Sequence, residues 1–500
     1  MTASYSGADW RDGYVTALDY TAGVYPSLFP EHLNYTCVLH GVEPPTLKRE
    51  YNYFELGCGR ACTVGVLAAS NPQARFYAND FMPSHVAEGR QRASDAGLDN
   101  LTLLEESFEA LADGGPDLPM FDYITMQGVY TWVSPQARQQ IVRFIDRRLK
   151  PGGVVAVGYN AMPGWAASTP LQRLMQASTQ WSRGDGANAV EAARALVQQL
   201  ARVDAENFKA GSAIDRRLAQ IAAASPTYLQ HEYLNRHWQP MYHADIAEDF
   251  AAAKLDFAGS AMLLTFGMAY PPDQQALLDA IPDPAWRETA KDYLLGTSFR
   301  TDVFVRGRRS MPPARQQERL GAFSVALTVP AATAREKLAH KAPSLVEIFG
   351  PALTRLSGQP CRLDDTEAWA SCGLSPELAQ QLAAILSMNR HATLFQQSAA
   401  RSEAVAAHAW NATVAAQALQ GGPCIALASP VTGGSIDTDV TGLAVYQQLL
   451  AHADAPQDSV AQRAVHALQG ISAEAPETLL MRALGVLETE LPTWRSLDVL

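Results

Sequence analysis

Short apolar runs alternate with helical stretches from about residue 50, which is the pattern of βα units around a parallel sheet. The apolar runs predict strands over residues 51–56, 75–78, 101–104, 121–126 and 154–159. Periodic segments between them predict helices over 61–69, 86–96 and 136–149. The pattern therefore predicts an α/β fold with a doubly wound parallel sheet.

The pattern changes after Trp165 and returns near residue 240. Residues 170–222 are rich in Ala, Gln and Arg at helical spacing, which predicts a helical insertion. A helix is predicted over 245–254, followed by strands over 255–261 and 301–306. We expect these last two strands to pair in antiparallel orientation.

A boundary is predicted at residues 306–315, where glycine, serine and two prolines break the pattern. Residues 316–500 are rich in Ala and Leu and predict a mainly helical domain with few short strands. A chain of 500 residues exceeds the size at which one hydrophobic core stops growing, so more than one domain is expected.

Charge and cysteine content narrow the class of protein. The net charge of −12 gives no overall attraction to nucleic acid or anionic lipid, and we expect neither as a partner. The first residues carry no basic segment followed by an apolar run, and the longest apolar stretches have strand length. The six cysteines form no C-x-x-C pair, which favours a reduced, cytoplasmic protein.

The candidate chemistry begins at Glu55-Leu56-Gly57-Cys58-Gly59, which ends the first predicted strand and opens a helix. Two glycines let the backbone approach a ligand, and a helix N-terminus supplies free N–H donors. Asp80 ends the second strand, where a carboxylate can accept both hydroxyls of a ribose. The third glycine of a dinucleotide-binding fingerprint is absent, which argues against nicotinamide. A glycine pair that only starts a helix is the alternative.

Two more loops reach the same edge of the predicted sheet. Glu106-Ser107-Phe108 follows the third strand, where a polar atom and an aromatic ring suit an adenine; packing of Phe108 in the core is the alternative. Residues 127–132, from Gln127 to Trp132, follow the fourth strand and place an amide and two large aromatic rings at the pocket mouth.

These residues resemble the class I S-adenosylmethionine-dependent methyltransferases. The motifs are Glu55 to Gly59, Asp80, Phe121-Asp122-Tyr123-Ile124 and Leu149-Lys150-Pro151-Gly152-Gly153. Residues 159–165 and 231–235 resemble the bacterial subgroup with a methyltransferase regulatory domain, which includes protein-lysine methyltransferases of outer-membrane proteins. The resemblance implies a Rossmann-like class I methyltransferase core with helical insertions and a mainly α C-terminal domain.

The resemblance also implies a domain plan and a cofactor site. Residues 1–50 would cover the site, 51–165 would bind S-adenosylmethionine, 166–308 would hold the insertion and remaining core strands, and 309–500 would form the C-terminal domain. Glu55, Gly57, Cys58 and Gly59 would hold the methionine part. Asp80 would bind the ribose, and Phe81, Ser107 and Phe108 the adenine. Gln127 completes the set; subgroup members often carry His there, and glutamine cannot act as a base.

Methyl transfer needs mainly alignment of a nucleophile and exclusion of water. We expect Tyr130, Trp132, Tyr159 and Asn160, at the ends of strands four and five, to line the acceptor pocket, with Tyr25 folding over it. Ordinary loop packing is the alternative for each. No general base stands out, which suits an amine better than a hydroxyl.

The leading function is therefore methylation of a protein lysine. The alternatives are N- or O-methylation of a small molecule and a non-catalytic cofactor-binding scaffold. His231, His237 and His243 recur every six residues, which is not a helical face spacing, so no metal site is expected. The sequence leaves the oligomeric state open.

Overall fold

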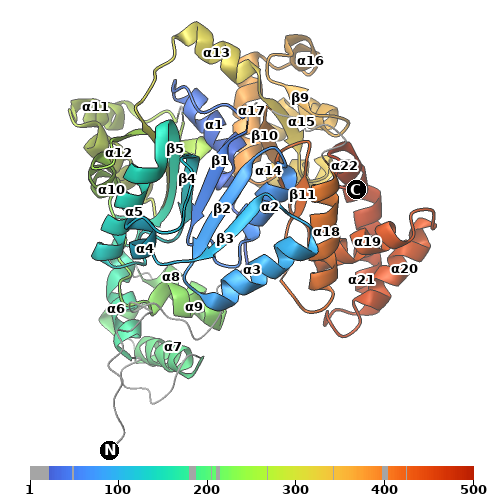
Figure 1. Ribbon diagram of the computed structural model, residues 1–500, viewed down its shortest axis with the longest axis horizontal. Coiled ribbons are helices and arrows are strands. Elements are labelled where there is room, and N and C mark those ends of the chain that lie inside the picture. Colours follow the sequence, from blue (N-terminus) through green and yellow to red (C-terminus); the bar gives the residue numbers. More distant parts are fainter. Residues whose placement is uncertain are drawn as a thin grey trace, which may run out of the picture.

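A seven-stranded sheet forms the centre of the computed structural model (Figure 1). The structure describes residues 22–47, 50–178, 187–203, 205–209, 214–266, 268–341, 343–396, 404–423 and 425–500. The strand order is β3-β2-β1-β4-β5-β7-β6. The strands are β1 (Asn52–Leu56), β2 (Arg75–Asp80), β3 (Leu101–Glu105), β4 (Phe121–Gln127), β5 (Leu149–Asn160), β6 (Leu255–Ser260) and β7 (Phe299–Arg306).

The direction of the strands divides the sheet into two parts. Strands β1 to β5 pair with one another in parallel orientation, as the βα pattern predicts. Strand β7 runs antiparallel to both β5 and β6, which confirms the predicted pairing of the last two strands. Because the order reverses between β1 and β4, their carboxyl ends open a crevice of the kind that binds ligands in doubly wound folds.

Helices cover both faces of the sheet with separate apolar clusters. The helices are α1 (Pro30–Leu39), α2 (Cys62–Ser70), α3 (Pro83–Asp95), α4 (Phe108–Ala112), α5 (Pro135–Arg148) and α10 (His243–Ala251). Residues of α1 and α2 pack with one face, and residues of α5 and α10 pack with the other. Every residue of α1 is buried, because its other side packs against the C-terminal region: Tyr35 and Phe323 meet edge to face at 5.1 Å between ring centroids.

The predicted insertion is helical and has its own apolar cluster. It comprises η2 (Ala166–Ser168), α6 (Thr169–Ser178), α7 (Ala187–Arg202), η3 (Glu206–Phe208), α8 (Asp215–Ala223) and α9 (Pro226–Tyr233). Its cluster gathers Met175, Val197 and Leu229 around Trp165 and also takes in Trp132 from the loop after β4. Before β7 the chain forms η4 (Leu263–Thr265), α11 (Pro272–Ala280) and α12 (Pro284–Leu295). The insertion therefore lies against the carboxyl edge of the sheet.

The rest of the chain is mainly helical, as the sequence predicts. The helices are α13 (Pro313–Gly321), α14 (Ala331–Lys341), α15 (Pro343–Leu356), α16 (Thr366–Ser371), α17 (Pro376–Met388), α18 (Val405–Ala418), α19 (Val440–Ala451), α20 (Gln457–Ala467), α21 (Pro476–Gly485), η6 (Val486–Glu490) and α22 (Leu491–Ser496). The short strands β8 (Ser324–Leu327), β9 (Cys361–Arg362) and β10 (Ala392–Phe395) form one small sheet, and β11 (Leu427–Ser429) and β12 (Gly434–Ile436) a second. None of the described helices is both long and apolar enough to cross a membrane.

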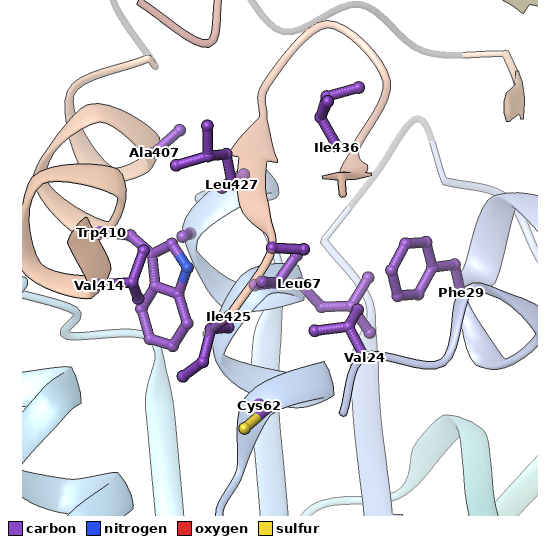
Figure 2. Close-up of a cluster of buried hydrophobic side chains, with 14 of the residues drawn as sticks. Val24, Phe29, Cys62, Leu67, Ala407, Trp410, Val414, Ile425, Leu427 and Ile436 are labelled. Atoms are coloured by element: carbon purple, nitrogen blue, oxygen red, sulfur yellow. The ribbon is translucent and has the colours of Figure 1, made fainter. Parts of the chain in front are cut away.

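The C-terminal region shares one hydrophobic core with helix α2. Figure 2 shows Trp410 and Val414 of α18 beside Cys62 and Leu67 of α2. A Cβ atom on Gly65 would lie 2.2 Å from Cη2 of Trp410, so only glycine leaves room for the indole against α2. The predicted division of the chain at residues 308–309 remains a prediction, because apolar packing continues across it.

Candidate active site at the carboxyl edge of the sheet

The glycine-rich turn after β1 is held in place from the end of β2. Gly57 and Gly59 have φ angles of 62° and 53°, a region that favours glycine. The Gly59 amide donates to Oδ2 of Asp80 at 2.8 Å, and the Cys58 amide donates to the carbonyl of Asn79 at 2.9 Å. The turn and the two strand ends therefore form one unit.

This turn lines a pocket that is partly open to solvent. Its walls are Ala22, Gly23, Tyr25, Glu55, Gly57, Cys58, Gly59, Arg60, Cys62 and Gln127. The N-terminal segment contributes one side: the Tyr25 amide donates to the Thr63 hydroxyl at 3.2 Å. Residues 1–21 of the predicted covering segment lie outside the described residues.

Two buried oxygen atoms at this pocket accept no hydrogen bond in the described part of the chain. They are Oε2 of Glu55 and Oε1 of Gln127, from adjacent strands β1 and β4. Burial raises the pKa of Glu55 to about 8, and the nearby charge of Asp80 acts in the same direction. A pair of unsatisfied buried acceptors fits a ligand that brings N–H donors, above all a cationic amine.

Asp80 is buried and already organises the site. Its Oδ1 accepts from the Met82 amide at 2.9 Å, while Oδ2 holds Gly59. A carboxylate offers about four lone pairs, so Asp80 can still accept from hydroxyl groups. Asp80 does not line the pocket itself; it lies beside it, behind the glycine turn.

The predicted adenine-site residues follow β2 and β3 at the same edge but do not line the pocket. Ser107 accepts from the Ala110 amide at 3.1 Å and so caps α4, and Phe108 packs partly on the core beneath it. Phe81 directly follows Asp80. Their roles remain predictions.

Sequence reasoning missed Asn79. Its Oδ1 accepts from Gly57 at 3.4 Å and its Nδ2 donates to the carbonyl of Glu106 at 2.9 Å, which ties together the loops after β1 and β3. The sequence does place an amide side chain at the carboxyl end of a parallel strand, and that position could have indicated a role in holding the neighbouring loops.

The four predicted acceptor-site residues lie at the ends of β4 and β5, and none lines the pocket. The Tyr130 hydroxyl donates to Asp249 at 2.8 Å, and the Tyr159 hydroxyl donates to Asp302 at 2.7 Å on the α10 side of the sheet. Trp132 stacks on His231 with 6.3 Å between ring centroids. The Asn160 amide donates to Glu232 of α9 at 2.8 Å. Their part in methyl transfer remains a prediction.

The other histidines singled out in the sequence have structural partners. His243 Nδ1 lies 2.8 Å from Oδ2 of Asp302, which also binds Arg300. Arg300 reaches Asp292 and Glu288 of α12 as well, so this buried network joins β7 to α10 and α12. The Arg300 and His243 charges hold the pKa of Asp302 well below its usual range.

Gly158 of β5 makes room for Gln127. The two residues pair across β4 and β5, and a Cβ on Gly158 would lie 2.1 Å from Oε1 of Gln127. We expect Gly158→Ala to lower the free energy of unfolding by about 1–3 kcal/mol. Thermal unfolding measures this, and Gln127→Ala in the same chain should restore most of the loss. A single variant as stable as the wild type would contradict the contact.

Two regions of this chain match known protein families. Residues 54–155 match the family described as "Methyltransferase domain". The chain carries a methyltransferase domain. Residues 225–306, from α9 to β7, match the family described as "Predicted methyltransferase regulatory domain". The methyltransferase domain therefore contains the glycine turn and Asp80, and the regulatory match contains Glu232 and the Arg300 network.

One relative and one solved structure resemble this chain over much of its length. An uncharacterized protein of Synechocystis sp. is 38% identical over 323 residues, 64% of this chain and 63% of that protein. The match thus spans less than two thirds of the relative. PKMT2 from Rickettsia typhi, solved in complex with AdoHcy, superimposes with a TM-score of 0.68 at 17% identity, covering 95% of this chain and 99% of that one. This likeness confirms the class I methyltransferase fold expected from the sequence.

Proposed function

We propose that this chain is an S-adenosylmethionine-dependent methyltransferase that modifies a lysine amine of a protein. The observation that carries the cofactor half is the pair of unsatisfied buried oxygens, Glu55 Oε2 and Gln127 Oε1, at the pocket beside the glycine turn. The methyltransferase domain match supports the same half.

The residues present fit the cofactor. A bound S-adenosylmethionine supplies a methyl group on a positively charged sulfur, which an amine can attack directly. Glu55 and Gln127 would accept from its amino group, and Asp80 from its ribose hydroxyls. Gly57 leaves no side chain between turn and ligand; a Cβ there would in any case meet Val129 at 2.6 Å. Ala22, Gly23 and Tyr25 would keep water from the pocket.

The acceptor half rests on two lines of support. The motifs at 159–165 and 231–235 resemble the subgroup that includes protein-lysine methyltransferases. The fold of PKMT2 also extends over nearly the whole chain, so the insertion and C-terminal region are shared with it. A small-molecule acceptor and a scaffold without turnover are the outcomes that would replace this proposal.

The test uses methyl-labelled S-adenosylmethionine and heat-treated proteins of the source cell. One half of the proteins is first acetylated with N-hydroxysuccinimide acetate, which converts lysine amines into non-nucleophilic amides, and then treated with hydroxylamine, which restores any acetylated hydroxyl groups. We expect label in the untreated proteins and little in the blocked ones. Equal label in both would exclude lysine, label only in small molecules would make this a metabolite enzyme, and no transfer would favour the scaffold.

Cofactor binding should release a proton from Glu55. With a pKa of about 8, Glu55 is mostly protonated at pH 7, while a cationic amino group at Oε2 favours the ionised form. AdoHcy affinity should therefore rise as pH rises toward 8. Calorimetry at pH 7 in buffers of different ionisation enthalpy should show release of about one proton. Glu55→Gln should release none, and an identical release from both proteins would contradict the assignment.

A further inference from the structure

Asn160, at the carboxyl end of β5, is in contact with the helical insertion. Gly158 and Asn160 are two residues apart on β5, so both side chains point to the same face, and Gly158 lies directly beneath Gln127 of the cofactor pocket. The Asn160 side chain therefore lies just beyond that pocket, on the same face of the sheet as the Gln127 side chain. The backbone of Asn160 is fixed as well: its N–H donates to the Thr131 hydroxyl at 3.5 Å, and its carbonyl accepts from the Met241 N–H at 3.0 Å.

The partner of Asn160 is a buried carboxylate from the insertion. Oε1 of Glu232 accepts from Nδ2 of Asn160 at 2.8 Å, although the two residues are 72 positions apart. Only 7% of Glu232 is exposed. A buried carboxylate costs free energy unless a donor or cation satisfies it, and a neutral amide satisfies one of its oxygens.

The surroundings of Glu232 are aromatic. Its neighbour in the chain, His231, stacks on Trp132, and Trp238 packs edge to face on Trp165 at 4.9 Å. Indole rings attract cations and exclude water. A carboxylate surrounded by such rings can bind an ammonium group, because the carboxylate and the ring faces both attract a cation.

We propose that Glu232 is the acceptor-binding carboxylate of this enzyme, which binds a primary ammonium group and takes one of its protons, while Asn160 positions it. The inference rests on the proposed function and deepens it, since it names the residue that binds the acceptor amine and removes its proton. The ammonium N–H bond breaks and the proton moves to a carboxylate oxygen, leaving a lone pair on nitrogen. That nitrogen forms the bond to the methyl carbon as the carbon–sulfur bond breaks and its electron pair stays on sulfur. The product is a methylated ammonium, and Glu232 loses its proton to solvent.

The electrostatics suit this role. Burial raises the pKa of Glu232 to about 7, and the Asn160 amide, the Arg217 charge and the Trp238 indole N–H partly oppose the shift. A base with a pKa near the working pH transfers protons most effectively. The Arg217 guanidinium itself lies over the Trp165 ring at 3.9 Å. Among the described residues, the other titratable groups beside Glu232 belong to its own helix α9: Tyr228, His231 and Tyr233.

The first test compares Glu232→Gln with wild type in the labelling of heat-treated proteins from pH 6 to 9. With S-adenosylmethionine saturating at every pH, so that protonation of Glu55 does not limit binding, wild-type labelling should fall below pH 7 as Glu232 becomes protonated, and E232Q should label about 100-fold more slowly at pH 7. AdoHcy affinity should be unchanged, because Glu232 does not line the cofactor pocket. The matched control is Glu206→Gln, an exposed glutamate of η3 in the same insertion.

The outcomes separate this inference from the function it rests on. If wild-type protein labels nothing, the proposed function and this inference both fail. If wild type labels proteins and E232Q loses less than tenfold, only the role of Glu232 fails. Glu232→Asp keeps a carboxylate and should keep the wild-type pH dependence; it decides the matter should E232Q fail to fold.

A second readout needs no turnover. Infrared difference spectra between pH 6 and 8 of protein with ¹³C-carboxyl glutamate should show one carboxyl with a midpoint near 7 that E232Q lacks. The comparison is needed because burial also raises the pKa of Glu490 to about 7 and that of Glu55 to about 8. Added n-butylamine, a cation at these pH values, should lower the Glu232 midpoint. Asn160→Ala should raise both this midpoint and that of the labelling profile, whereas a merely structural role would leave both unmoved. An unaltered midpoint with n-butylamine would overturn ammonium binding.

Discussion

Replacing Asp80 by alanine is expected to weaken AdoHcy binding about a thousandfold. The ribose hydroxyls would each lose a charged acceptor, and such hydrogen bonds contribute about 1.5–3 kcal/mol. Two of them amount to about 4 kcal/mol, or roughly a thousandfold in Kd. The variant also frees the amides of Gly59 and Met82, which Asp80 holds at 2.8 and 2.9 Å. The glycine turn then loses its anchor on β2.

Calorimetric titration with AdoHcy measures this effect. The matched control is Asp95→Ala, which removes an exposed carboxylate from the end of α3 that bonds only Gln91 within the described residues. Its affinity should equal that of the wild type. Wild-type affinity in Asp80→Ala would disprove the cofactor site, whatever the acceptor.

Replacing Trp410 by alanine is expected to lower the free energy of unfolding by about 3–5 kcal/mol, the usual cost of deleting a buried aromatic side chain. Only 1% of Trp410 is exposed, and it joins the C-terminal region to α2 in the cluster of Figure 2. Urea unfolding followed by far-ultraviolet circular dichroism measures the change. Trp286→Ala is the matched control, because that tryptophan on α12 is 54% exposed and should change stability little.

The partner residue Gly65 turns this into a test of the contact itself. A Cβ on Gly65 would lie 2.2 Å from the indole, so Gly65→Ala alone should destabilise by about 1–3 kcal/mol through overpacking. With Trp410 replaced by alanine the clash is gone, and the same change should stabilise by up to about 1 kcal/mol through helix propensity. The sign of the Gly65→Ala effect should therefore reverse between the two backgrounds. Equal effects in both would show that the residues do not touch.

A second contact, made by Arg92, links the glycine-rich turn after β1 to the C-terminal region. Buried Arg92 of α3 donates to the Arg60 carbonyl at 2.9 Å and to Gln417 of α18 at 3.0 Å. Arg60 lines the cofactor pocket. Loss of Trp410 should thus also weaken AdoHcy binding, more than loss of the exposed Trp286 does.

The sequence by itself predicted the strands of the sheet, and it predicted which polar and glycine residues follow those strands at the carboxyl edge. Glu55, the two glycines and Asp80 stand at the ends of parallel strands, and parallel strands end at one edge, so local pattern alone brings them together. The antiparallel pairing of β6 with β7 was also expected from the sequence and is confirmed.

Only the tertiary structure decided which side chains of the helical insertion and the C-terminal region lie near the carboxyl edge of the sheet. Glu232 reaches Asn160 through an insertion whose packing depends on Trp132, Trp165 and Trp238. Helix α1 has a Pro start like many surface helices, yet it is buried along its whole length between the sheet and the C-terminal region. Local pattern cannot report such contacts, because burial depends on what lies across an interface and not on the period of the segment itself. Gly65 reads as a weak point in a helix until Trp410 is seen to lie on it.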